Sequence, residues 1–166
     1  MRPLLVGESY DGECLGLGTS SGRRLCSIMG LDAEEYLERF IRRNLCPFEW
    51  SPNAAQSTAR NIIVNAMFGV GSSRIVMLGR RVADAFRDGF TSLGAVDVPR
   101  FELLCGYRFV RSDDEVTMVV LPHPSGRCRV WNEKKSIRRA RRLLAEAEII
   151  PLVPVFVPNK RKARTG

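Results

Sequence analysis

One segment organises this sequence: Leu121-Pro122-His123-Pro124-Ser125-Gly126-Arg127-Cys128-Arg129-Val130-Trp131-Asn132. It follows an apolar run, 116–121, that is typical of a buried strand, and it precedes an arginine-rich helical pattern. The prolines on both sides of His123 fix φ, and Ser-Gly then permits a tight bend. The only histidine of the chain therefore projects, with a hydroxyl and two arginines, from a stiff turn at the end of a strand. Such a turn suits a functional site.

Apolar runs elsewhere in the chain predict an α/β fold. Strands are expected at 3–7, 74–78 and 116–121, with a brief extended segment at 44–47. Helices are expected between and after them, over about 19–29, 33–43, 52–68, 80–87 and 133–146. This alternation predicts a three-layer αβα sandwich around a mostly parallel sheet of four strands.

Residues that favour helix starts mark three of these boundaries. Thr19 or Ser20 is expected to cap the first helix and Asp32 the second, and Pro52 stands where proline prefers to open a helix. Residues 101–110 are irregular or strand-like. The prolines within 149–157 restrict that apolar segment to an edge strand or an extended clasp.

Length and charge indicate one basic domain. The chain has 166 residues, of which 45% are hydrophobic, so we expect a single domain over 1–158 and a basic, flexible tail over 159–166. Lys and Arg number 26 against 18 Asp and Glu, which gives a net charge of +8 and favours a polyanionic partner. Because arginines crowd the His123 turn and the helix after it, DNA or another nucleic acid is the expected partner.

The cysteines and the hydropathy pattern exclude several classes of protein. Five widely spaced cysteines form no C-x-x-C pair, so we expect reduced structural thiols and no metal, cluster or other cofactor. No apolar run approaches the roughly 18 residues that span a membrane, and the first residues lack the architecture of a signal peptide. We therefore expect a soluble, cytoplasmic monomer.

Four residues each follow a strand candidate by at most two positions: Glu8, Asn44, Gly79 and His123. Ligands in parallel sheets bind beyond the carboxyl ends of the strands, so these residues should share one rim. A carboxylate and an imidazole placed there could act together on a water and a leaving group, and the Asn44 amide could pair with a pyrimidine edge. Each residue also has a structural interpretation: a solvated glutamate, a histidine that orders its loop, or an asparagine that satisfies backbone carbonyls.

The sequence lacks the motifs of two other kinds of enzyme, serine hydrolases and P-loop enzymes that hydrolyse nucleoside triphosphates. Ser125 is not in a G-x-S-x-G elbow, and the glycine-rich loop 12–22 has no P-loop lysine. A thiol nucleophile at Cys128 is an alternative, because the arginines on either side would lower the pKa of its thiol.

Two motifs resemble those of the uracil-DNA glycosylase superfamily. The segment 123–129 resembles its second signature motif, written H-P-S-P-L-S in one branch and N-P-S-G-L-S-R in another. Val6-Gly7-Glu8-Ser9-Tyr10 resembles the first motif, best in the branch that reads G-E-A-P-G, and Asn44-Leu45-Cys46-Pro47 resembles the strand end whose asparagine reads the base. The resemblance covers 4–145 as an order of elements and implies the αβα fold of that superfamily.

The resemblance implies a monofunctional DNA glycosylase that flips out an unusual pyrimidine and hydrolyses its N-glycosidic bond, in repair or in defence against phage DNA. Glu8 would orient or activate water and stabilise positive charge on the sugar. His123 would hydrogen-bond the pyrimidine O2 as negative charge develops on the leaving base, while Asn44 would read the base edge. No lysine lies in the site loops, so a Schiff-base lyase step is not expected.

Contacts to the DNA strands follow from the same resemblance. Ser125 and the Gly126 amide would grip phosphate, and Arg127 stands where the family commonly places a leucine wedge that fills the gap in the duplex. Arg129 would touch phosphate or the opposite strand. The basic tail adds two further candidates for DNA binding, Lys160 and Arg161.

The sequence also departs from the family pattern. Ser9-Tyr10 replaces a small residue and proline, and the stacking phenylalanine that usually follows is missing, so Tyr10, Phe48 or Trp50 would supply the aromatic face. The cysteines do not match the iron–sulfur arrangement of the G-E-A-P-G branch. A reshaped pocket beside loop 12–22 could take a larger, hypermodified base. Two alternatives stay open: a non-catalytic DNA-binding module or decoy, and an enzyme that acts on free nucleosides or nucleotides.

Overall fold

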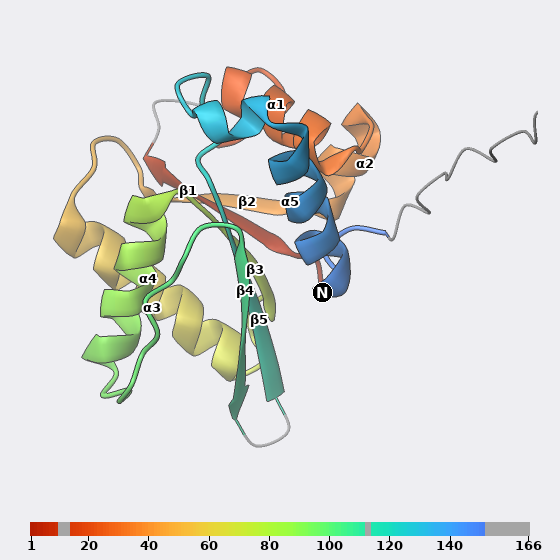
Figure 1. The fold of residues 1–166 in the computed structure, drawn as a ribbon. Helices are drawn as coiled ribbons and strands as arrows, with labels where there is room; N and C mark the ends of the chain where they lie inside the picture. The colour runs from red at the N-terminus through yellow and green to blue at the C-terminus, as the bar shows by residue number, and fades with distance from the viewer. Residues whose placement is uncertain (10–13, 112–113, 152–166) are drawn as a thin grey trace, which may run out of the picture.

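A five-stranded sheet forms the centre of the molecule (Figure 1). The computed structural model describes residues 1–9, 14–111 and 114–151. The strand order is β2-β1-β3-β5-β4, in which β4 is antiparallel to β5 and the other pairs are parallel. The strands are β1 Leu4–Ser9, β2 Ile41–Cys46, β3 Arg74–Leu78, β4 Cys105–Arg111 and β5 Asp114–Leu121. The predicted α/β class and mostly parallel sheet are confirmed, whereas the predicted count of four strands is wrong because β4 adds an antiparallel edge.

Helices cover both faces of the sheet (Figure 1). Alternate residues of a strand point to opposite faces, so in β1 Val6 joins one core and Leu5 joins the other. The Val6 side is covered by α3 (Pro52–Met67) and α4 (Arg80–Ser92), and the Leu5 side by α1 (Ser20–Met29), α2 (Ala33–Arg39) and α5 (Lys134–Glu146). This arrangement is compatible with a three-layer sandwich.

The expected capping residues set the helix starts. The Thr19 side chain accepts a hydrogen bond from the backbone of Gly22 at the start of α1. Asp32 and Glu35 form a capping box at the start of α2. Pro52 opens α3 in its first turn, behind the cap Ser51.

Two predicted helix ends are wrong. The sequence predicts a helix to Arg43, whereas α2 ends at Arg39 and 41–46 forms the edge strand β2. The reason is Phe40, which is buried on extended backbone and turns the chain onto the sheet. The predicted helix 80–87 continues to Ser92 because Phe90, one turn after Phe86, is also buried in the core. Gly89 lets α4 lie close to α3, since a Cβ there would be 3.1 Å from the backbone nitrogen of Arg60.

The end of the chain is described in part. Ile149 and Ile150 are buried in the core beside α1 and α5. The rest of the expected strand or clasp, 152–157, and the basic tail with Lys160 and Arg161 lie outside the described residues, as does Tyr10. Within the described ranges no helix is both long enough and apolar enough to cross a membrane.

Candidate active site

Three of the predicted site residues meet at one edge of the sheet. β1, β2, β3 and β5 are parallel, so their carboxyl ends share this edge. Glu8 lies near the end of β1, Asn44 lies near the end of β2, and His123 follows β5 by two residues. Glu8 and His123 line the same two hollows, and Asn44 lines one of them. The order of strands therefore brings together side chains that are far apart in the sequence.

Gly79 lies next to both Glu8 and His123. It follows β3, has a φ of 99°, and donates its N–H to the carbonyl of Leu121 over 2.8 Å. A Cβ at this position would lie 3.3 Å from Glu8 Oε1 and 3.3 Å from the Cβ of His123. Glycine is needed here both for a backbone conformation that other residues rarely adopt and for the close approach of two side chains.

Asn44 is held against the backbone of β1. It pairs in register with Gly7, and its Oδ1 occupies the space that a Cβ on Gly7 would take. The Cys14 thiol donates to the same oxygen, with 3.1 Å between Sγ and Oδ1. Burial raises the pKa of this thiol to about 11, against the opposing effect of Arg42, so the donor keeps its hydrogen at neutral pH. The amide nitrogen of Asn44 has no hydrogen-bond partner within the described ranges.

Backbone and side-chain hydrogen bonds fix the His123 turn. The N–H of Ser125 donates to His123 Nδ1 over 3.1 Å, and the indole N–H of Trp131 donates to the His123 carbonyl over 3.1 Å. Arg24 of α1 donates to the Ser125 carbonyl over 3.0 Å. Because Nδ1 accepts a hydrogen bond, neutral His123 carries its proton on Nε2 and presents that nitrogen as a donor.

Two hollows share Glu8 and His123 as lining residues. The outer hollow, about 550 Å³, is lined by these two residues and by the turn residues Ser125, Gly126 and Arg127. The inner pocket, about 100 Å³, lies between Glu8, His123 and the loop before α1, and is lined by Gly7, Glu8, Leu15, Thr19, Ser21, Asn44 and His123. A small pocket and a wider surface hollow therefore both border the carboxylate and the imidazole.

Glu8 also contacts a cation. Arg81, in the first turn of α4, places Nη1 3.6 Å from Glu8 Oε2. The guanidinium carbon of Arg81 lies 5.8 Å from the centre of the Trp50 ring. The Glu8 side chain is 25% exposed, so water reaches the carboxylate from the outer hollow.

The remaining predicted residues lie at different distances from the hollows. Gly126 and Arg127 form the exposed tip of a turn that the Cys128 N–H closes on the Ser125 carbonyl, and both line the outer hollow. Arg129, on the short 3-10 helix Arg129–Asn132, is exposed and lines neither hollow. Cys128, the alternative thiol nucleophile, also lines neither.

The aromatic residues do not supply a face inside the pocket. Phe48 is 74% exposed after β2 and lines neither hollow. Trp50 packs against Arg81 and the core below α3. Tyr10, the third candidate, lies outside the described residues.

Sequence reasoning missed four residues that contact and position the predicted site residues: Cys14, Arg24, Arg81 and Trp131. Only Arg81 had a usable signal, because it stands two residues after Gly79 at the start of a helix on the expected rim. The other contacts join segments that no local pattern connects. Within the described ranges, no three His, Cys, Asp or Glu side chains come together as a metal site would require.

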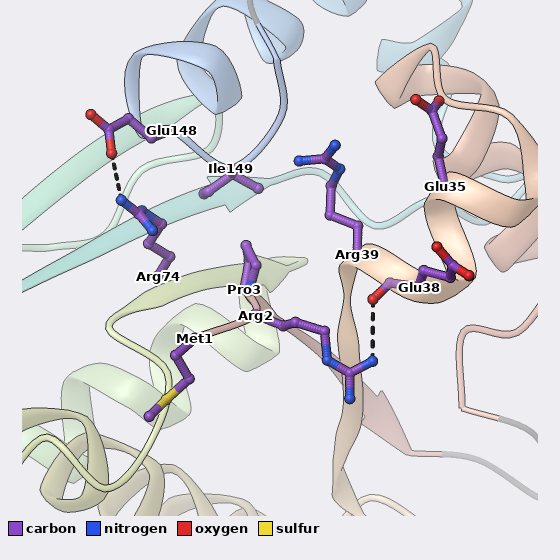
Figure 2. A pocket seen from close by; sticks show the side chains of 9 residues that line it. All are labelled: Met1, Arg2, Pro3, Glu35, Glu38, Arg39, Arg74, Glu148 and Ile149. Carbon is purple, nitrogen blue, oxygen red and sulfur yellow. Dashed lines mark hydrogen bonds and ion pairs between the residues drawn. The ribbon is translucent and has the colours of Figure 1, made fainter.

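A further hollow of about 570 Å³ lies elsewhere, beside the starts of β1 and β3 (Figure 2). Three arginines and three glutamates line it, together with Met1, Pro3 and Ile149. Arg74 pairs with Glu148, and Arg2 donates to the Glu38 carbonyl over 3.1 Å. The charges that line this hollow are balanced in number, and those of Arg74 and Glu148 neutralise each other.

Comparison with known proteins identifies no relative: no protein-family profile, no curated protein and no solved structure matches the chain.

Proposed function

We propose that this protein is a DNA glycosylase that flips an unusual pyrimidine out of DNA and hydrolyses its N-glycosidic bond, leaving an abasic site. The observation that carries the proposal is the placement of Glu8 and His123 close together beside Gly79, where both line the inner pocket and the outer hollow. The resemblance of the two sequence motifs to the uracil-DNA glycosylase superfamily supports it, since these two residues stand in those motifs.

The two hollows would bind different parts of a flipped nucleotide. The inner pocket would hold the base, and the outer hollow would hold the sugar and phosphate beside Ser125 and Gly126. The glycosidic bond would then lie between Glu8 and His123. Such extrusion is needed because neither the bond nor the base edge is reachable inside the helical stack.

The hydrolysis can be written with these two side chains. The bond between C1′ and the base nitrogen breaks, and its electron pair leaves with the base. Water held by Glu8 forms the new bond to C1′ and gives its proton to the carboxylate. His123 donates from Nε2 to the pyrimidine O2, where negative charge develops; a preorganised donor of this kind stabilises the transition state. The Ser125 N–H supports that role because it engages Nδ1 and orients the ring.

The inner pocket is small for a base. Its volume is about 100 Å³, less than that of an apolar cavity of about 150 Å³ that accommodates benzene. Even a bare pyrimidine would therefore extend into the outer hollow, and a hypermodified base would extend further. The free Asn44 amide nitrogen would donate to the base edge.

Exposed cations supply a surface for the rest of the DNA. Arg127 projects at the tip of the turn, and α5 begins directly after the 3-10 helix that follows it. The exposed face of α5 carries Lys134, Lys135, Arg138, Arg139 and Arg142. Phosphate contacts of this kind position a protein on DNA without reading sequence.

The test is abasic-site formation, measured as alkali-labile cleavage, on a panel of single- and double-stranded DNAs. The panel contains unmodified, uracil-containing and mismatched DNA, and genomic DNA with hydroxymethylated or glycosylated cytosine or substituted thymine. His123→Ala and Glu8→Gln are run beside the wild type. Cleavage of one class is expected, and both variants should reduce its rate strongly.

Two other results would each indicate a different function. One result is that no DNA in the panel is cleaved, while salt-dependent binding is retained and does not change in Glu8→Gln. This would indicate a non-catalytic DNA-binding module. Cleavage of free nucleosides that duplex DNA does not inhibit would indicate an enzyme of nucleoside metabolism.

A further inference from the structure

We propose that Arg81 is a positioning residue that fixes the carboxylate of Glu8 for the reaction, an inference that rests on the proposed function. The two carboxylate oxygens of Glu8 face different groups. Oε2 lies 3.6 Å from Arg81 Nη1, and Oε1 lies 3.3 Å from the point where a Cβ on Gly79 would be, on the side of His123. Arg81 is therefore ion-paired with one oxygen, while the other lies beside Gly79 and His123, where the proposed mechanism needs the attacking water.

Arg81 is itself supported. Its guanidinium lies over the ring of Trp50, with the central carbon 5.8 Å from the ring centre, and such a cation–π contact restricts a long, flexible side chain. Trp50 in turn packs against the core beside α3. The orientation of Glu8 thus depends on a chain of contacts from the core through Trp50 and Arg81.

Because the ion pair of Arg81 and Glu8 is exposed, its effect on the position of Glu8 can be measured apart from its effect on the free energy of unfolding. The Arg81 side chain is 63% exposed, so its ion pair with Glu8 is screened by water and contributes little to the free energy of unfolding. Removing the guanidinium should leave the fold intact and free the Glu8 side chain to rotate. A misplaced catalytic group can reduce a rate by up to about 100-fold.

A different role for Arg81 would leave a different signature. If Arg81 only bound a DNA phosphate, its loss would weaken affinity and leave the rate of the bound complex unchanged. If it positions Glu8, the rate at saturating protein falls and affinity stays nearly constant. Arg87 is the matched control, because it lies on the same helix and pairs with Asp84 and Asp88 on the exposed side, away from Glu8.

The experiment measures single-turnover cleavage at saturating protein, and the dissociation constant for DNA, in R81A, R81K and R87A. We expect R81A to lower the rate by about tenfold with less than a twofold change in affinity. R81K should recover part of the rate, because an ammonium still pairs with Glu8 but lacks the planar guanidinium that lies over the Trp50 ring. R87A should match the wild type. In an E8Q background, R81A should cause no further loss of rate.

Three results would overturn the proposal: an unchanged rate in R81A, a loss confined to affinity, or the same loss in the E8Q background as in the wild type. Crystal structures of the wild type and R81A without DNA provide a readout that needs no activity. Glu8 should change its side-chain conformation in R81A while His123 stays in place. An unmoved Glu8 would end the proposal even if the wild type cleaves no DNA, and a wild type that cleaves none would count against the glycosylase assignment alone.

Discussion

The backbone N–H of Ser125 donates to Nδ1 of His123, with 3.1 Å between the two nitrogens. The donor belongs to the main chain, so the orientation of the imidazole is set by the shape of the turn and not by the serine hydroxyl. Pro124 is buried between the two residues, which makes that shape rigid. The turn thus presents Nε2 of His123 toward the hollows as a fixed donor.

His123→Ala is expected to reduce the single-turnover rate by about 100- to 1,000-fold, the usual effect of removing one preorganised donor to a developing negative charge. Ser125→Ala is the control, because it keeps the backbone N–H that orients the ring. Its effect should be confined to DNA affinity, through the lost hydroxyl contact to phosphate. Both variants are compared by alkali-labile cleavage and by DNA titration. Full activity in His123→Ala would remove this residue from the mechanism.

Gly79→Ala is expected to damage both stability and activity. A residue with a side chain at φ 99° is strained, at a cost of about 1–3 kcal/mol in the free energy of unfolding. Its Cβ would also press on Glu8 Oε1 and on the Cβ of His123 at 3.3 Å. Urea unfolding measures the first effect, and single-turnover cleavage at a temperature where the variant is folded measures the second.

Gly94→Ala and Gly126→Ala separate the two effects of the Gly79 substitution. Gly94 has a φ of 80° and nothing within 4 Å of its added Cβ. Its substitution should therefore lower the free energy of unfolding and leave the cleavage rate unchanged. Gly126 has open space and is not among the residues with positive φ, so alanine there should leave unfolding unchanged. If Gly94→Ala lowered the rate as much as Gly79→Ala does, crowding between Glu8 and His123 would not be the cause.

The strand ends of this fold were predictable because local patterns determine them. Apolar runs bounded by glycine or proline predicted β1, β3 and β5, and the rule that parallel strands end together then placed Glu8, Asn44 and His123 on one rim. Helix starts at Asp32 and Pro52 were equally local, since a capping side chain acts within one turn.

Contacts that join distant segments were not predictable. Arg42 and Arg43 read as the last turn of a helix, and only the burial of Phe40 and pairing with β1 place them on strand β2. The bond from Cys14 to Asn44 and the ion pair of Arg81 with Glu8 likewise depend on the order of strands in the sheet. No spacing in the sequence encodes such neighbours.

The Cys14 thiol should make stability depend on pH in alkaline solution. Burial raises its pKa from 9.0 to about 11 in the folded protein. Between these values the unfolded chain loses the proton while the folded chain keeps it, so the free energy of unfolding falls as pH rises from about 9 to about 11. Below pH 9 the contribution is fully present.

Cys14→Ser isolates this effect, because its hydroxyl does not titrate in that range and can still donate to Asn44. Urea unfolding of the reduced proteins is measured across the window from pH 9 to 11. The unfolding free energy of the wild type minus that of Cys14→Ser should fall as the pH rises. Cys26, whose pKa is also raised by burial, is present in both proteins and cancels. A difference that stays constant across the window would contradict the assignment.

Lys134 and Arg138 of α5 should contribute to DNA binding through charge alone. They are one helical turn apart on an exposed face, and neither has an ion-pair partner within the described ranges. Lys134 also lies in the first turn, where the helix dipole disfavours a cation, and no side chain caps that end. Helix stability therefore does not explain this lysine, and under the proposed function it would contact phosphate.

The double variant K134A/R138A should weaken binding to unmodified duplex DNA and reduce the slope of log affinity against log salt by about 2. R60A/R87A removes the same charge from α3 and α4 on the opposite side of the sheet, and is expected to change the slope by much less. Cleavage at saturating protein should be unaffected in both, because phosphate contacts position the duplex without touching the reacting atoms. If the two double variants changed the slope equally, net charge and not the face of α5 would govern binding.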